Sequence, residues 1–230
     1  LPMKIFAIIG NPIKHSLSPA LHNWVFKSLG IDAEYEKKRV FQNQLAGIIS
    51  DLHCGKLDGI NVTIPHKENI MQYLDEINPR AKSIGAVNLI MKNGNKLVGN
   101  NTDWFGLTMA LKKNGIDPSG KEVIVLGAGG AARSIIFAIK QSGVKKIVLL
   151  NRTLQKAEKL QDEIVFPSSL EDSVMVIKND SIIINTTSVG MQSEQSPLDL
   201  GLLHENQILI DVIYTPLETA ILKFGKKIGA

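Results

Sequence analysis

Continuous apolar runs and helically spaced apolar residues alternate along this chain. Runs of apolar residues are typical of buried parallel strands, whereas apolar residues three or four positions apart are typical of helices. The segments that fit buried strands are 5–9, 58–64, 123–126, 146–150, 181–185 and 207–212. Helical spacing recurs between them, at 18–29, 45–52, 70–74, 103–111 and 134–139. This alternation predicts an α/β fold.

Two segments depart from the buried-strand pattern. Residues 33–39 alternate between apolar and polar, which predicts a strand at an exposed edge. Asn93-Gly94-Asn95 lies between two further apolar runs, at 86–90 and 96–99, and predicts a hairpin.

The helix expected after residue 17 has a recognisable start. Ser18 is expected to be its N-cap, with Pro19 at the first helical position. We expect Leu21, Trp24, Val25 and Leu29 to form the apolar face of this helix.

A glycine-rich turn follows the apolar run 123–126. It contains Gly127, Ala128, Gly129, Gly130 and Ala131, and together with Ala132 in the last position these form the pattern G-x-G-x-x-A. Gly127 permits the tight turn, and Gly129 lets a pyrophosphate approach the backbone beside a helix N-terminus. The pattern predicts a dinucleotide site; the alternative is an ordinary turn that uses glycine for its backbone freedom.

The next apolar run, 146–150, ends in polar and basic residues. Asn151, Arg152, Thr153 and Lys156 follow it, where an NAD site normally carries an acid. A guanidinium pairs with a 2′-phosphate, whereas a carboxylate repels it. NADP is therefore the predicted cofactor, and the alternative is a solvated, basic strand end.

Composition adds limits to this picture. The 230 residues fit one large domain or two modest ones. We expect an N-terminal open α/β substrate domain at 1–101 and a Rossmann-like, doubly wound domain at 102–230, with a cleft between them. The net charge of +4 is scattered, so nucleic acid is not indicated.

Further limits concern the compartment. The lone cysteine fits a reducing compartment, and neither a membrane span of about 18 apolar residues nor a secretion signal occurs, so a cytoplasmic location is expected. Leu1-Pro2 before Met3 permits an origin in a longer polypeptide.

Several polar side chains follow predicted strands and could carry chemistry. Ser16 and Ser18 could each donate a hydrogen bond to a carboxylate, although Ser18 is explained equally well as a cap. Lys67 and Asp103, both at strand-to-helix junctions, are acid–base candidates, and the alternative for each is a cap or a surface charge. No metal site is predicted, because no cysteine or carboxylate is spaced around His15 and His66 as metal ligands would be.

Taken together, motifs along the whole chain resemble one family. They are Gly10-Asn11-Pro12, Ser16 to Pro19, His22-Asn23, Asn61 to Lys67, Gly85 to Asn88, Asn101-Thr102-Asp103, Gly127 to Ala131, Asn151-Arg152-Thr153, Asn185-Thr186-Thr187 and Asp211 to Tyr214. The chain resembles the shikimate dehydrogenases of the biosynthetic, NADP-dependent type. The Asn-Val-Thr-Ile-Pro-His-Lys stretch is the most specific of these motifs.

The resemblance implies a reaction and its alternatives. It implies reversible, NADP-dependent reduction of 3-dehydroshikimate to shikimate in chorismate and aromatic amino acid biosynthesis, by a monomer or homodimer. A quinate/shikimate dehydrogenase of relaxed specificity, a non-catalytic NADP-binding sensor and a part of a bifunctional chain remain alternatives. Family members normally continue beyond the equivalent of Ala230 with a strand, a glutamine-bearing loop and a return helix, which this sequence lacks.

The resemblance also implies roles for individual residues. Lys67 is the expected acid–base residue, with Asp103 as its partner. The expected substrate ligands are Ser16 and Ser18 for the carboxylate, Asn61, Thr63, Asn88 and Asp103 for the ring hydroxyls, and Tyr214 at the closing side of the pocket. The expected cofactor ligands are Gly127 to Ala131 for the pyrophosphate, Asn151, Arg152, Thr153 and Lys156 for the 2′-phosphate, and Val212 for the nicotinamide.

Overall fold

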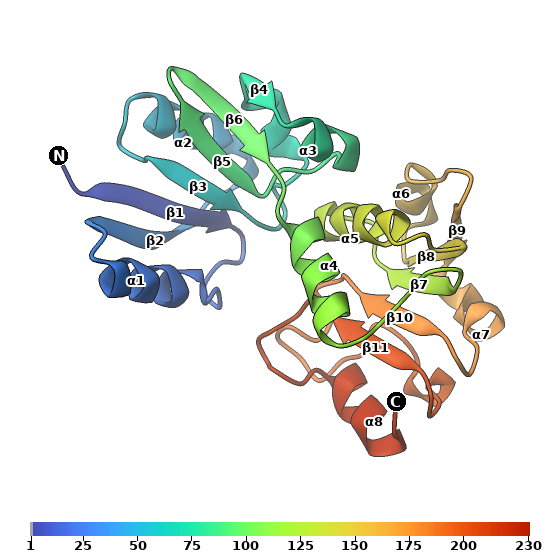
Figure 1. Ribbon diagram of the computed structural model, residues 1–230. Coiled ribbons are helices and arrows are strands. Elements are labelled where there is room, and N and C mark those ends of the chain that lie inside the picture. Colours follow the sequence, from blue (N-terminus) through green and yellow to red (C-terminus); the bar gives the residue numbers. More distant parts are fainter. Residues whose placement is uncertain (1) are drawn as a thin grey trace. The chain divides into compact units, whose positions relative to one another are not determined.

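The chain forms two compact α/β units. The computed structural model describes residues 2–230, and the first unit ends at Thr102 while the second begins at Asp103 (Figure 1). Each unit has its own sheet and its own apolar core. The α/β class expected from the alternation of strands and helices is confirmed.

The first unit contains a mixed six-stranded sheet with the order β2-β1-β3-β5-β6-β4. Its strands are β1 (Lys4–Gly10), β2 (Ala33–Arg39), β3 (Gly59–Val62), β4 (Glu76–Ile77), β5 (Leu89–Asn93) and β6 (Lys96–Asn100). β5 alone is antiparallel to its neighbours, and β5 and β6 form the predicted hairpin. β2 lies at the edge, as its alternation predicts.

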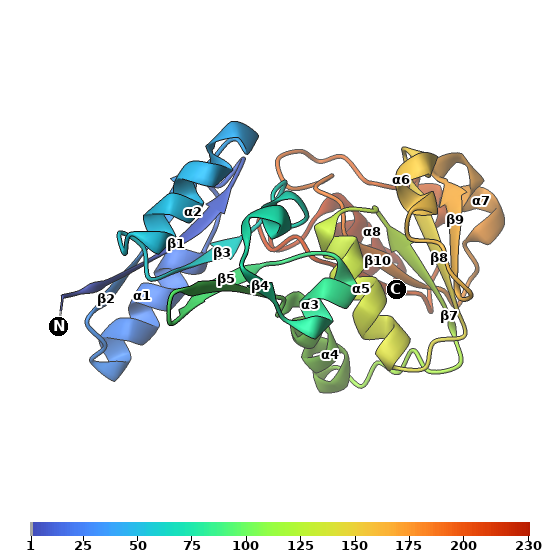
Figure 2. The same ribbon diagram turned by 90° about the horizontal axis from the view of Figure 1, so that it is seen from above.

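Helices cover both faces of this sheet (Figures 1 and 2). They are α1 (Ser18–Leu29), α2 (Leu45–His53) and α3 (Pro79–Ile84), with 3-10 turns at Gln42–Gln44 and Asn69–Tyr73. Alternate residues of β1 serve opposite faces: Ile9 packs with α2, whereas Ile8 belongs to the cluster that includes Phe26 of α1. A 3-10 helix at residues 69–73 stands where the spacing at 70–74 predicts a helix.

The start of α1 differs from its prediction. Leu17 is the N-cap, so Ser18 is the first helical residue and Pro19 the second. The backbone N–H of Ser18 donates to Oγ of Ser16 at 3.3 Å. The serine that supports the start of the helix is therefore Ser16, and the capping role expected for Ser18 is wrong.

The apolar face predicted for α1 is also wrong, except at the half-buried Val25. Leu21, Trp24 and Leu29 are 61–68% exposed. The helix instead turns Phe26 toward Phe6, with ring centroids 5.8 Å apart. Apolar residues occur on both sides of this helix, so periodicity alone could not identify the side that meets the sheet.

The second unit contains a five-stranded parallel sheet with the order β11-β10-β7-β8-β9. Its strands are β7 (Glu122–Leu126), β8 (Lys146–Asn151), β9 (Val165–Ser169), β10 (Ile182–Asn185) and β11 (Ile208–Asp211). Its helices are α4 (Asp103–Lys113), α5 (Gly130–Gln141), α6 (Leu154–Glu158), α7 (Ser173–Val176) and α8 (Ala220–Ile228), with 3-10 turns at Leu170–Asp172 and Leu200–Leu202. Strand order reverses beside β7, which confirms the predicted doubly wound, Rossmann-like sheet.

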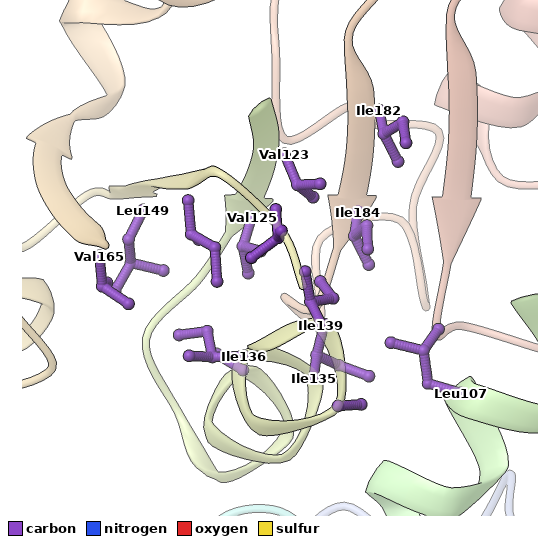
Figure 3. Close-up of a cluster of buried hydrophobic side chains, with 14 of the residues drawn as sticks. Leu107, Val123, Val125, Ile135, Ile136, Ile139, Leu149, Val165, Ile182 and Ile184 are labelled. Carbon is purple, nitrogen blue, oxygen red and sulfur yellow. The ribbon is translucent and has the colours of Figure 1, made fainter. Parts of the chain in front are cut away.

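Both faces of this second sheet are covered. On one face, side chains of β7 and β10 pack against α5 (Figure 3). The strands contribute Val123, Val125, Ile182 and Ile184, and the helix contributes Ile135 and Ile139. On the other face, Ile124 and Ile183 pack with Ile221 of α8. Burial on both faces explains why these strands are continuous apolar runs rather than alternating ones.

Candidate substrate and dinucleotide sites

Polar residues collect at one edge of the first sheet. β1, β3 and β6 end there, and β5 begins there because it runs in the opposite direction. Asn61 pairs with Leu89, and Leu89 with Asn100, so the residues flanking these positions are neighbours. The edge therefore brings together Asn61, Asn88 and Thr102 from three separate segments.

Hydrogen bonds join these three residues directly. Nδ2 of Asn61 donates to the backbone oxygen of Asn88 at 3.1 Å. Nδ2 of Asn88 donates to Oγ1 of Thr102 at 3.0 Å, and the N–H of Thr102 donates to Oδ1 of Asn88 at 2.9 Å. Asn88 is only 7% exposed. Two of the predicted substrate ligands, Asn61 and Asn88, thus belong to one network.

Tyr35 extends this network and was not foreseen from the sequence. Its hydroxyl donates to Oδ1 of Asn61 at 2.6 Å, and its ring stacks on His22 with centroids 4.3 Å apart. Burial lowers the pKa of His22. The His22-Asn23 motif was the only sequence signal near Tyr35, and it gave no indication of the contact with Asn61.

Lys67 lies in the turn between β3 and the 3-10 helix at 69–73. Its side chain is half-buried, and its backbone oxygen accepts from the N–H of Val87 at 2.8 Å. Val87 precedes Asn88, so the backbone of Lys67 is fixed beside the polar network. The sequence placed Lys67 at a strand-to-helix junction, and the structure agrees.

His66 anchors this turn from within the protein. It is fully buried, and its Nε2 lies 2.7 Å from the backbone oxygen of Val40. A carbonyl only accepts, so Nε2 carries the hydrogen, while Nδ1 is buried with no partner among residues 2–230. In the same part of the chain, no group of three or more His, Cys, Asp or Glu residues could hold a metal ion.

The end of β1 brings the serine loop close to Thr63. A Cβ at Gly10 would lie 2.5 Å from Cγ2 of Thr63, so only glycine fits there. The N–H of Thr63 donates to the oxygen of Ile9 at 2.9 Å. Of the two serines that follow, Ser16 is buried and Ser18 half-buried. The predicted carboxylate ligands thus follow a strand end that directly contacts Thr63.

Asp103 belongs to the second unit. It is half-buried and is the first residue of α4, immediately after Thr102 of the network. An acid in the first helical turn is favoured by the helix dipole, which is the structural alternative considered for it. Its pairing with Lys67 stays a prediction.

In the second unit, Gly127 makes a turn that requires glycine. Its φ is +101°, and a Cβ would lie 2.8 Å from Oγ1 of Thr186. Its N–H donates to the oxygen of Leu150 at 2.8 Å, which ties the turn to the end of β8. The turn therefore lies where strand order reverses, between β7 and β10.

At Gly129 the backbone does not require glycine, but the absence of a side chain leaves space beside a helix N-terminus. Its φ of −96° suits any residue, and a Cβ there would meet no described atom within 4 Å. Gly129 is also the N-cap of α5, and within the described chain no side chain caps that helix. The open space and the uncapped N–H groups fit a pyrophosphate.

Asn185 and Asp211 fix the loops beside this turn. Nδ2 of Asn185 donates to both carboxylate oxygens of Asp211 at 3.1 Å, and its Oδ1 accepts from the N–H of Thr187 at 3.0 Å. Asp211 also accepts from the N–H of Ile213 at 2.9 Å. This pair, whose role the sequence did not indicate, holds the segment that carries the exposed Val212 and Tyr214.

The basic strand end adjoins the same turn. Asn151 ends β8, and its Nδ2 donates to the backbone oxygen of Thr153 at 2.7 Å. Arg152 and Lys156 are exposed, and no carboxylate of the described residues forms an ion pair with Arg152. Two cations thus lie between the end of β8 and the first turn of α6, where a 2′-phosphate is expected.

A doubly wound parallel sheet with a glycine turn at its switch point defines a dinucleotide-binding protein of the α/β class. The comparisons specify it further. Residues 8–90 match the model of the shikimate dehydrogenase substrate binding domain, and residues 108–198 that of shikimate / quinate 5-dehydrogenase. The shikimate dehydrogenase (NADP(+)) of Bacillus cereus strain AH187 is 42% identical over 99% of this chain and 85% of its own. The chain belongs to the shikimate dehydrogenase family.

Solved structures agree with this assignment. Shikimate dehydrogenase 1 of Peptoclostridium difficile superposes with a TM-score of 0.91 at 35% identity, over 99% of this chain and 84% of that one. The shikimate 5-dehydrogenase of Thermus thermophilus, in complex with NADP(H) and shikimate, gives 0.86 at 36% identity, over 99% and 85%. The resemblance found in the sequence is therefore confirmed.

Proposed function

We propose that this protein is an NADP-dependent shikimate dehydrogenase. The proposed reaction converts 3-dehydroshikimate, NADPH and a proton into shikimate and NADP⁺, reversibly. The observation that carries the proposal is the polar edge of the first sheet. There Asn61 donates to the backbone oxygen of Asn88, Thr63 donates to the oxygen of Ile9, and the oxygen of Lys67 accepts from Val87. A ligand rich in hydroxyl groups suits such an edge, because amides, hydroxyls and an ammonium can each bond to it.

Each substrate ligand has a role in this proposal. Ser16 and Ser18 bind the carboxylate, and Asn61, Thr63 and Asn88 bind ring hydroxyls. Asp103 also binds a ring hydroxyl and assists Lys67, and Tyr214 covers the bound ring. These assignments rest on the family resemblance and on the placement of the first-unit residues at one sheet edge.

Lys67 is the proposed acid–base residue. Bound NADPH supplies the hydride that reaches C3 of the substrate carbonyl. The Lys67 ammonium donates its proton to the C3 oxygen as that oxygen gains charge, and in the reverse direction the neutral amine accepts the hydroxyl proton. The bond from Val87 to the backbone oxygen of Lys67, and the bond between His66 and Val40, hold the backbone of this turn.

The second unit is the proposed NADP domain. Gly127, Ala128, Gly129, Gly130 and Ala131 surround the pyrophosphate, and the open space at Gly129 supports this. Arg152 and Lys156 neutralise the 2′-phosphate, with Asn151 and Thr153 beside them. Val212 contacts the nicotinamide, on a segment that Asp211 holds in place.

One alternative has specific support. The family model matched by residues 108–198 covers both shikimate and quinate dehydrogenases, so activity on quinate is a second candidate. A non-catalytic NADP sensor is less well supported, because Lys67 and Asp103 are both present.

The cellular setting is part of the proposal. We expect a cytoplasmic monomer or homodimer that takes small molecules rather than nucleic acid. The lone, exposed Cys54 fits a reducing compartment, and the positive charges are scattered rather than clustered. No helix in residues 2–230 is long and apolar enough to span a bilayer.

Turnover of the purified protein tests the proposal. Shikimate and quinate are each supplied with NADP⁺ or NAD⁺, and formation of the reduced cofactor is followed by absorbance. We expect the highest kcat/KM for shikimate with NADP⁺. A higher value for quinate would favour the alternative, and absence of turnover with all four combinations would refute a dehydrogenase function.

A further inference from the structure

Hydrogen bonding fixes the orientation of the Asn61 side chain. An amide side chain has a donor end and an acceptor end, and its two orientations are distinguished only by their partners. The backbone oxygen of Asn88 can only accept, so the atom facing it at 3.1 Å is Nδ2. The other end is therefore Oδ1, and the Tyr35 hydroxyl donates to it at 2.6 Å.

One hydrogen of the amide remains available. Nδ2 carries two hydrogens, and the Asn88 oxygen accepts one of them. No residue in the described part of the chain accepts the second, and Asn61 is half-buried at the sheet edge. Asn61 thus offers a ligand an N–H donor, while its oxygen is engaged by Tyr35.

Tyr35 reaches Asn61 across a strand. β2 and β3 flank β1 on opposite sides, so the Tyr35 side chain passes over β1 to contact β3. Its ring is 4% exposed and lies nearly parallel to the His22 ring, at an interplanar angle of 9°.

The backbone of Tyr35 is fixed as well. Its N–H donates to Oδ1 of Asn23 at 2.8 Å, and its oxygen accepts from Nδ2 of Asn23 at 2.9 Å. Two consecutive residues of α1 therefore hold Tyr35: His22 contacts its ring, and Asn23 bonds to its backbone.

We propose that Tyr35 is a positioning residue that makes Asn61 a hydrogen-bond donor to a substrate hydroxyl oxygen. The inference rests on the proposed function and deepens it, because it specifies which atom of Asn61 meets the ring. Without the Tyr35 hydroxyl, Oδ1 of Asn61 has no donor among residues 2–230, and the bond to the Asn88 oxygen is the one that holds the amide there. It can then rotate and present its oxygen to the ligand, which lowers the occupancy of the productive orientation.

The test is a double-mutant cycle on shikimate oxidation. The variants are Tyr35→Phe, Asn61→Ala and the two combined, with KM and kcat measured for shikimate and NADP⁺. Tyr35→Phe keeps the ring on His22 and removes only the hydroxyl. Loss of one neutral hydrogen bond predicts a rise of about three- to tenfold in the KM for shikimate. The KM for NADP⁺ is expected to stay unchanged, and in the Asn61→Ala background the effect of Tyr35→Phe should vanish.

Two further variants distinguish a positioning role of Tyr35 from a general structural role. Tyr73→Phe removes a tyrosine hydroxyl for which no hydrogen bond is found in residues 2–230, and it should leave the KM for shikimate unchanged. Asn61→Asp keeps the shape but removes the N–H donor, so it should weaken shikimate binding, measured by titration, more than Tyr35→Phe does. This variant also serves if the Tyr35 variant does not fold.

The outcomes distinguish this inference from the proposed function. An equal effect of Tyr35→Phe in both backgrounds would overturn the positioning role and leave a structural one. An Asn61→Asp variant that binds shikimate like the wild type would overturn the donor role. Absence of wild-type turnover with shikimate refutes the proposed function itself, before any variant is compared.

Discussion

At the residue scale, the turn after β7 needs glycine at two positions for different reasons. Gly127 has φ of +101° and a neighbouring Thr186 in the way, whereas Gly129 has an ordinary φ and open space. Gly127→Ala should therefore lower the free energy of unfolding by about 1–3 kcal/mol. Gly129→Ala should change it by less than about 1 kcal/mol and yet weaken NADP binding, because the methyl group occupies the pyrophosphate space. Urea unfolding and NADP titration measure the two effects, and a Gly129→Ala variant with normal NADP affinity would contradict this account.

Arg152 is expected to account for most of the preference for NADP over NAD. A hydrogen bond to a charged group contributes about 1.5–3 kcal/mol, so Arg152→Ala should reduce the ratio of the two kcat/KM values by about ten- to a hundredfold. Lys159→Ala, which removes an exposed cation at the end of α6, is the matched control. Equal losses for both cofactors would show that Arg152 does not contact the 2′-phosphate.

His22 should make stability depend on pH. Burial lowers its pKa in the folded protein below the usual value of 6.5. The unfolded chain therefore binds the proton more readily, and the free energy of unfolding should fall as the pH drops through about 6.5. Urea unfolding at pH 7.5 and pH 5.5 should show a smaller loss for His22→Gln than for the wild type. An identical loss in both proteins would mean that His22 does not contribute.

At the scale of elements, the ends of β1 and β3 constrain each other. A Cβ at Gly10 would lie 2.5 Å from Cγ2 of Thr63 and 3.0 Å from the oxygen of Ile64. Gly10→Ala should push these strand ends apart, at a cost of about 1–3 kcal/mol in stability, and raise the KM for shikimate. Gly47→Ala, in α2 where a Cβ meets nothing within 4 Å, should instead be neutral or stabilising. Unchanged stability in both variants would contradict the close approach.

The strands that are buried on both faces gave the clearest signal in the sequence. The strands at 123–126 and 182–185 are covered on both faces, so their apolar runs were unambiguous. β4 and α7 have two and four residues, too few to show a period, and were missed. α8 was missed although Ile221 and Ile228, seven positions apart, carry a helical signal.

The site was predictable only where one segment carries it. The turn at 127–131 and the strand end at 151–153 are local patterns, and the structure shows the backbone geometry they imply. The bonds from Tyr35 to Asn61 and from Asn185 to Asp211 join residues 26 positions apart in each case. Such partners depend on the order of strands in the sheet, which the periodicity of apolar residues along the sequence does not reveal. The capping role of Ser18 failed for a local reason, since the helix begins one residue earlier than expected.

At the scale of the whole molecule, two units divide the proposed work. The first holds the polar edge with Lys67, and the second holds the glycine turn with Arg152. Substitutions at the polar edge should therefore change the KM for shikimate, whereas substitutions at the glycine turn or at Arg152 should change the KM for NADP⁺. The chemical step depends on the first unit, because Lys67 is the proposed proton donor and acceptor.

The most direct test is the kcat for shikimate oxidation by Lys67→Met. Methionine keeps most of the side-chain volume and removes the proton-carrying group. Loss of an acid–base residue predicts a fall in kcat of about 10²–10⁴, with the KM values for shikimate and NADP⁺ little changed. Lys82→Met, which replaces an exposed lysine of α3, should keep the wild-type kcat. A Lys67→Met variant with wild-type kcat would contradict the central claim that Lys67 transfers the proton.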